Sequence, residues 1–63
     1  MDHEEDYKGH RIAAYTVQQG KRYAWRYTID GEGFTRSEDR ALEDEEIMLH
    51  EAVADAKLKI DRM

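Results

Sequence analysis

The sequence contains no cysteine and no proline, and its single serine is Ser37. Without cysteine no disulfide can cross-link the chain, and the three histidines, at positions 3, 10 and 50, are too scattered to suggest a metal cross-link. A chain of 63 residues buries only about 60% of the surface that its unfolded form exposes. We therefore expect one small domain without a large internal active-site cavity, which either packs very efficiently or gains stability by pairing with another chain.

Long apolar runs are also missing. No stretch approaches the ~18 consecutive apolar residues that a membrane-spanning helix needs. The first six residues, MDHEED, are acidic, whereas a secretory signal peptide begins with basic residues. We expect a cytoplasmic protein, and the lack of cysteine is compatible with a reducing compartment.

Acidic residues outnumber basic residues, and the formal net charge of -5 argues against the general attraction to phosphates that dominates nucleic-acid binding. The charges are unevenly distributed. Residues 1–6 hold four acids and no base, residues 7–36 hold six bases and two acids, and residues 37–63 hold nine acids and four bases. The middle of the chain is therefore basic and both ends are acidic.

The chain is expected to consist of a tail and one domain. Residues 1–6 are charged and offer nothing to bury, which predicts an acidic, disordered tail. Residues 7–63 contain no internal repeat and no low-complexity linker, so we expect them to form a single domain.

Two stretches have the composition of strands. Residues 10–18, HRIAAYTVQ, are rich in β-branched and aromatic side chains and precede the turn residues Gln19 and Gly20. Residues 22–30, RYAWRYTID, alternate between apolar and polar side chains, which predicts a strand with one buried face. The side chains of that face are Tyr23, Trp25, Tyr27 and Ile29.

The dipeptide Asp30-Gly31 predicts a tight hairpin, because a type I′ turn needs positive φ at both central residues and Asp-Gly tolerates this well. A third strand over residues 32–36 then follows. With Asp30 and Gly31 as the two loop residues, Tyr27 is expected opposite Phe34.

The first hairpin allows two registers. If Gly20 takes the left-handed position of a three-residue loop with a bulge, the odd-numbered residues of the first strand face the core and Ile12 lies on the outer face. If Gln19 and Gly20 form a two-residue turn, the even-numbered residues, including Ile12, face the core instead. We prefer the first register, because glutamine is a poor first residue for a type I′ turn.

A helix is expected over about residues 44–62, since residues 37–63 lack Gly and Pro and are rich in good helix formers. Acids crowd its first turn and bases its end, as the helix dipole favours. Ser37 is expected to cap an earlier turn or to lie in the loop. The apolar stripe consists of Leu49, Ala52, Val53, Ala56, Ile60 and Met63.

These elements predict an α+β fold of the order β-β-β-α. A three-stranded antiparallel sheet over residues 10–18, 22–30 and 32–36 should pack its Trp25 face against the C-terminal helix in a single two-layer core.

No group of residues predicts catalysis, a bound metal or a cofactor, so we do not expect an enzyme. A nucleophile needs an adjacent base, and Ser37 is better explained as a cap or loop residue. Glu46 and His50 lie four residues apart and share a helix face, but a metal site needs three or four ligands. A surface hydrogen bond between Glu46 and His50 is the simpler interpretation.

The most distinctive feature of the sequence is the mixture of bases and aromatics in the strands. The aromatics are expected to form the core, because a thin sheet and one helix need that apolar area. The outer face of the sheet then remains available to an acidic partner surface or to a second copy. The residues expected on this possible partner-binding face are Ile12, Arg22 and Arg26.

Two families share features with the chain. Gly33-Phe34-Thr35, followed by the acids at 44–46 and by spaced alanines, resembles the HicB-like antitoxin domain, although the Pro-Gly-Cys segment of that family is absent. The stretch YKGHRI at 7–12, with Trp25 in a strand and AKLKID at 56–61, is more similar to short stand-alone bacterial domains of unknown function. Both resemblances imply a β-β-β-α fold and neither carries a catalytic residue over.

The leading functional hypothesis is a non-enzymatic protein-protein interaction module that forms a homodimer, motivated by the thin core and the segregated charges. The HicB-like resemblance implies an alternative, a regulatory protein that binds a small basic toxin. A third hypothesis is an RNA-binding sheet that uses Arg22 and Arg26, which the negative net charge disfavours.

Overall fold

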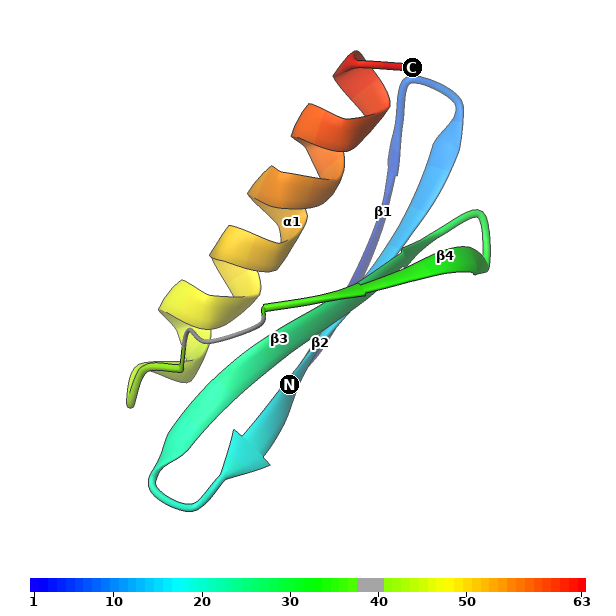
Figure 1. The fold of residues 1–63 in the computed structure, drawn as a ribbon. Coiled ribbons are helices and arrows are strands. Elements are labelled where there is room, and N and C mark those ends of the chain that lie inside the picture. The colour runs from blue at the N-terminus through cyan, green and yellow to red at the C-terminus, as the bar shows by residue number, and fades with distance from the viewer. Residues whose placement is uncertain (38–40) are drawn as a thin grey trace.

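The computed structural model describes residues 1–37 and 41–63 of the chain. Over these residues the protein forms four strands and one helix, and the helix crosses one face of the sheet (Figure 1). The sheet is antiparallel throughout, with neighbouring strands in chain order. The elements are β1 (Asp2–Tyr7), β2 (His10–Gln19), β3 (Arg22–Ile29), β4 (Glu32–Arg36) and α1 (Glu45–Asp61). The predicted α+β class and C-terminal helix are confirmed, whereas the predicted number of strands was one too few.

The additional strand is β1, which occupies the segment predicted to be a disordered tail. It pairs with β2 over its whole length, from Asp2 opposite Tyr15 to Tyr7 opposite His10. The acidic composition was misleading because an edge strand needs backbone hydrogen bonds rather than burial of every side chain. Its charges are also partly balanced, since the Arg11 guanidinium lies near two carboxylates of β1.

The hairpin between β2 and β3 has the register that was not preferred. Its loop is Gly20-Lys21, so Ile12 pairs with Ile29 and the even-numbered residues of β2 face the core. Gly20 has a φ of 64° and stands first in the loop, the place where a type II′ turn needs glycine. The three-residue loop was therefore wrong, and the two-residue alternative had the correct parity but placed the turn one residue too early.

The hairpin between β3 and β4 has the predicted Asp30-Gly31 loop, and both residues have positive φ, at 56° and 77°. The pairing further along differs from the prediction, because Tyr27 lies opposite Thr35 rather than Phe34. The register shifts between Tyr27 and Ile29, where a bulge in β4 adds one residue.

The core lies between α1 and the inner face of the sheet, where α1 packs mainly on β3 and β2. Ile12 and Tyr27 are 0% exposed, and Trp25 stacks on Tyr27 with ring centroids 5.6 Å apart. Two alanines, Ala52 and Ala56, are also fully buried, so the helix can approach the aromatic residues closely.

The predicted apolar stripe of α1 is largely confirmed. Leu49 and Ile60 are buried, as are the two alanines between them. Met63 is 72% exposed and was wrongly included, because it follows the last helical turn. Met48 is 0% exposed and was missed, although it lies one position from the stripe.

The helix begins where the sequence predicted. Asp44 is its N-cap, and the Asp44 carboxylate accepts a hydrogen bond of 3.1 Å from the backbone N–H of Ile47. Ser37 caps no helix in the described part of the chain. It is buried and anchors to β3, where its Oγ accepts a 3.0 Å hydrogen bond from the Trp25 N–H and its own N–H donates to the Trp25 carbonyl.

Polar contacts at the far end of α1 hold the helix on the sheet. The hydroxyl of Tyr7 and the ammonium of Lys8 both donate to the Asp61 carboxylate, at 3.0 and 2.6 Å. Closer to the middle of the helix, the buried Tyr27 hydroxyl donates to Asp55 at 2.6 Å. Burial and then this hydrogen bond raise the pKa of Tyr27 to about 12.

The stability of the fold is expected to fall in acid. The Arg11 backbone N–H lowers the pKa of Asp30 below its usual 3.8, and the Lys8 hydrogen bond does the same for Asp61. A carboxyl whose pKa is lower in the folded state stabilises the fold above its unfolded pKa, and this contribution is lost as the pH falls through the folded pKa. Urea unfolding at a series of pH values from about 6 down to about 2 measures this loss.

The variant Asp61→Asn is the control for this prediction, because it removes one of the carboxyl groups whose pKa is lowered by folding. It should flatten the dependence of the unfolding free energy on pH below 3.8. A wild-type protein that is equally stable at pH values well above and well below 3.8 would contradict the assigned contacts.

Candidate functional site

The face of the sheet opposite α1 is not covered by any part of the chain that the structure describes, and we call it the open face. Side chains alternate between the two faces of a strand, so the register assigns each residue to one of them. The open face carries Asp2, Glu4 and Asp6 from β1, Arg11, Ala13, Tyr15 and Val17 from β2, Arg22, Ala24, Arg26 and Thr28 from β3, and Arg36 from β4.

Charges on the open face are segregated by strand. All three residues that β1 places there are acidic and exposed. The opposite side of the face is basic, with Arg22 and Arg36 exposed and Arg26 half-buried. Between these sides lie mostly small or half-buried residues of β2 and β3, among them Ala13 and Val17, together with the exposed Arg11, whose guanidinium is paired with Glu4 and Asp6 of β1. The face is therefore acidic along one edge, basic along the other and weakly polar in the middle.

One cross-strand row passes through both charged sides. The register aligns Asp2 with Tyr15, Tyr15 with Arg26, and Arg26 with Arg36. Two like charges directly opposite each other on antiparallel strands destabilise the pairing. Arg26 and Arg36 therefore place two like charges opposite each other on the basic side of the open face.

A hollow of about 370 Å³ lies on the acidic side of the open face. It is lined by Asp2, Glu4, Ala13, Ala14 and Tyr15. The small side chain of Ala13 leaves space beside the tyrosine, and the carboxylate of Asp2 makes the hollow attractive to a cation, whereas Glu4 is already paired with Arg11.

The three residues predicted for a partner-binding face have different locations. Arg22 and Arg26 belong to the open face, as expected. Ile12 does not, because it is 0% exposed in the core, and its assignment to the outer face was wrong. The error follows from the register preferred for the first hairpin, which placed the odd-numbered residues of the strand in the core. For the same reason Tyr15 and Val17 were not predicted to lie on the open face. The signal that was available is Gly20, which suits the first position of a type II′ turn.

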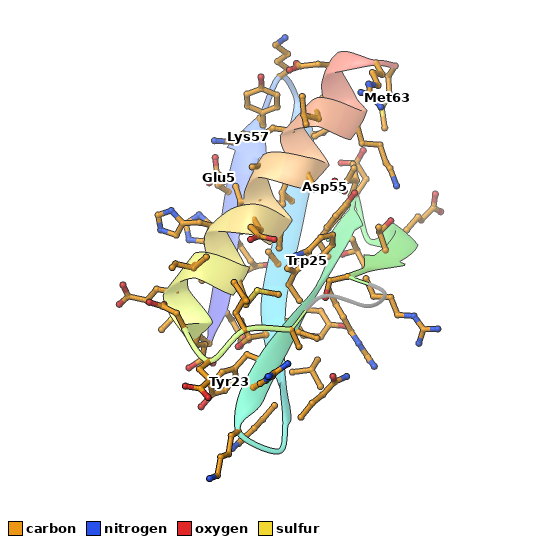
Figure 2. All side chains as sticks on the ribbon, turned by 60° about the vertical axis from the view of Figure 1, so that its left-hand side comes forward. Glu5, Tyr23, Trp25, Asp55, Lys57 and Met63 are labelled. Atoms are coloured by element: carbon orange, nitrogen blue, oxygen red, sulfur yellow. The ribbon has the colours of Figure 1, made fainter. Side chains whose placement is uncertain are left out.

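A second depression lies between β1 and α1, because the helix sits mainly over β2 and β3. Its volume is about 380 Å³, and its lining residues are His3, Glu5, Leu49, His50, Val53, Ala54 and Lys57. Figure 2 shows Glu5 and Lys57 side by side at this edge, and their charged atoms are 3.0 Å apart. Hydrogen bonds from His3 and then from Lys57 lower the pKa of Glu5. These polar groups thus partly satisfy one another.

The residues considered for metal binding do not assemble into a site. Within residues 1–37 and 41–63, no three His, Asp or Glu side chains are placed to hold a metal ion together. Glu46 and His50 line a shallow depression on the solvent side of α1, beside the exposed Ile47.

The fold and the open face together define the class of the protein: an α+β domain in which one helix covers one side of a four-stranded antiparallel meander. No family model, no curated protein and no solved structure matches the chain.

In the part of the chain that the structure describes, no helix is both long and apolar enough to cross a membrane. The resemblances to the HicB-like domain and to short bacterial domains stay predictions from the sequence.

Substitutions at Ile12 and Val17 separate the core from the open face. Truncating the buried Ile12 to alanine should lower the free energy of unfolding by about 2–4 kcal/mol, because it removes packed atoms and leaves a cavity. Val17→Ala should lower the free energy of unfolding by less than about 1 kcal/mol, since Val17 is half-buried on the other face. Urea denaturation measures both values. If Val17→Ala instead lowered the free energy of unfolding more than Ile12→Ala, the register in which Ile12 faces outward would be the correct one.

Proposed function

We propose that this protein is a small, non-enzymatic interaction module that associates with a second copy of itself through the open face. The observation that carries the proposal is that α1 covers one side of the sheet, while the other side combines half-buried apolar residues with acidic and basic edges. A sheet with apolar residues on both faces gains stability when a second layer covers the exposed face.

The dimensions of the open face suit a weak dimer. Eight residue pairs join β2 to β3, and with strands about 4.8 Å apart the face offers roughly 500 Å² of planar area per copy. Two copies then bury roughly 1,000 Å², which is near the lower limit for a specific interface. We therefore expect a dimer that dissociates on dilution in the micromolar range.

The small size of the domain supports association for an independent reason. With no disulfide and a two-layer core, its stability as a monomer is limited. Association stabilises the folded state by mass action, so the thermal midpoint should rise with protein concentration.

Sedimentation velocity from about 1 µM to about 1 mM tests the proposal, and the expected result is a monomer–dimer equilibrium. Val17→Asp places a charge among the apolar residues that β2 and β3 contribute to the open face and should abolish the dimer. Ile47→Asp is the matched control, because Ile47 is 48% exposed on α1, away from the open face, and the dimer should persist. Circular dichroism confirms that both variants fold. A wild-type protein that is monomeric at every concentration would refute the proposal.

A second candidate function, an RNA-binding sheet, is favoured by one observation. Tyr15 lies on the open face in the same row as Arg26 and Arg36, and an aromatic ring beside guanidinium groups is suited to stacking a base. The net charge of -5 opposes it.

Fluorescence anisotropy with a labelled single-stranded RNA tests this candidate. If RNA binds, the affinity should fall with added salt, and Tyr15→Ala should weaken it by about tenfold or more, as expected for a lost stacking contact. A binding curve that stays flat at low salt removes the candidate. An affinity that Tyr15→Ala leaves unchanged would place the RNA elsewhere on the protein.

A further inference from the structure

The charges of the open face select one arrangement of the two copies. This inference rests on the proposed self-association and specifies how the two copies are oriented relative to each other. Two identical sheets that pack face to face are related by a two-fold axis in the plane between them. In aligned packing, where the strands of the two sheets stay within about 30° of each other, the axis runs nearly along the strands or nearly across them. These two orientations bring different strands into contact.

An axis across the strands places β1 of one copy over β1 of the other. The open-face carboxylates of β1, which include Asp2 and Glu4, would then face their own equivalents. The basic strand β4 would likewise lie over β4 of the second copy, so neither edge would meet charges of the opposite sign. Like charges opposed across an interface repel each other, so this orientation is disfavoured.

An axis along the strands places β1 of one copy over β4 of the other, and β2 over β3. Acidic and basic edges then meet on both sides of the dimer. We infer that the second copy binds in this orientation, with Asp2 of each copy opposite Arg36 of the other.

The cross-strand row supports this assignment. A two-fold axis parallel to the strands keeps each residue at the same position along the strand direction. Each cross-strand row of one copy therefore lies over the same row of the other copy. Asp2 then faces Arg36 and Tyr15 faces Arg26, because these four residues occupy one row in the order Asp2, Tyr15, Arg26, Arg36. Packed sheets rotate by about 30°, which displaces Asp2 and Arg36 at the outer ends of this row more than Tyr15 and Arg26 at its centre.

The shape of the face fits the same arrangement. The hollow lined by Asp2, Glu4 and Tyr15 is about 370 Å³ and lies under the β4 edge of the second copy. In this arrangement the long side chain of Arg36 extends toward the hollow and the Asp2 carboxylate, while Glu4 stays paired with Arg11 of its own copy. In the neighbouring row, Val17 lies over Ala24, and these small side chains allow the sheets to approach to about 10 Å.

Exchanging the charges of one pair provides the test. Arg36→Glu and Asp2→Arg, each alone, should raise the dimer dissociation constant by about tenfold or more, because each creates two repulsive contacts in the symmetric dimer. The double variant Asp2→Arg/Arg36→Glu should restore the dissociation constant to within about threefold of wild type, since both contacts are again between opposite charges. Sedimentation equilibrium at low salt measures all three.

The control variant is Arg62→Glu, which changes the net charge as much as Arg36→Glu does but lies at the C-cap of α1, away from the open face. It should leave the dissociation constant unchanged. Fluorescence of the buried Trp25 verifies that every variant is folded.

The outcomes distinguish the inference from the proposed function. If the wild type dimerises but both single variants associate as tightly as wild type, the orientation is refuted and self-association stands. The orientation is also refuted if Arg62→Glu weakens the dimer as much as Arg36→Glu, or if the double variant is weaker than both single variants. A wild type without any dimer refutes the proposed function and the orientation together.

Discussion

The pairing of β2 with β3 is the interaction on which the rest of the structure depends. Its two-residue loop at Gly20-Lys21 decides which side chains of β2 face α1 and which form the open face. Because side chains alternate along a strand, a shift by one residue would move Ile12 out of the core and bring Tyr15 in. The hydrophobic core and the candidate interface are thus two consequences of one register.

The helix completes a core that is small but well filled. Buried alanines on α1 let the helix lie close to Trp25 and Tyr27, so two aromatic residues supply much of the apolar volume. Polar contacts then hold the helix in place at its edges, including the Tyr27 hydroxyl on Asp55 and the Lys8 ammonium on Asp61. Packing determines where α1 lies, and these contacts limit how it can slide or rotate.

Edge strand β1 has a different role from the other three strands. It contributes little to the core, and its inner face is polar enough to leave a depression beside α1. On its outer side it supplies the carboxylates that make the open face electrically asymmetric. The strand therefore extends the sheet without enlarging the core. It also gives the proposed dimer its complementary charges, since the basic residues of β3 and β4 have their counterpart on β1.

Local chemistry determined much of this protein from the sequence alone. The alternation in RYAWRYTI, the Asp30-Gly31 turn and the start of the helix near residue 44 each depend on residues close together in the chain, and each of these predictions agrees with the structure. The apolar spacing of α1 agrees except at Met48 and Met63. The tertiary structure decided what depends on distant partners. Strand β1 forms because β2 offers it backbone hydrogen bonds, which its charged composition does not reveal. The placement of Ile12 and Tyr15 followed from the number of residues in the turn between β2 and β3. Gly20 takes positive φ in both registers that the sequence allowed, so the pairing within the packed sheet decided between them.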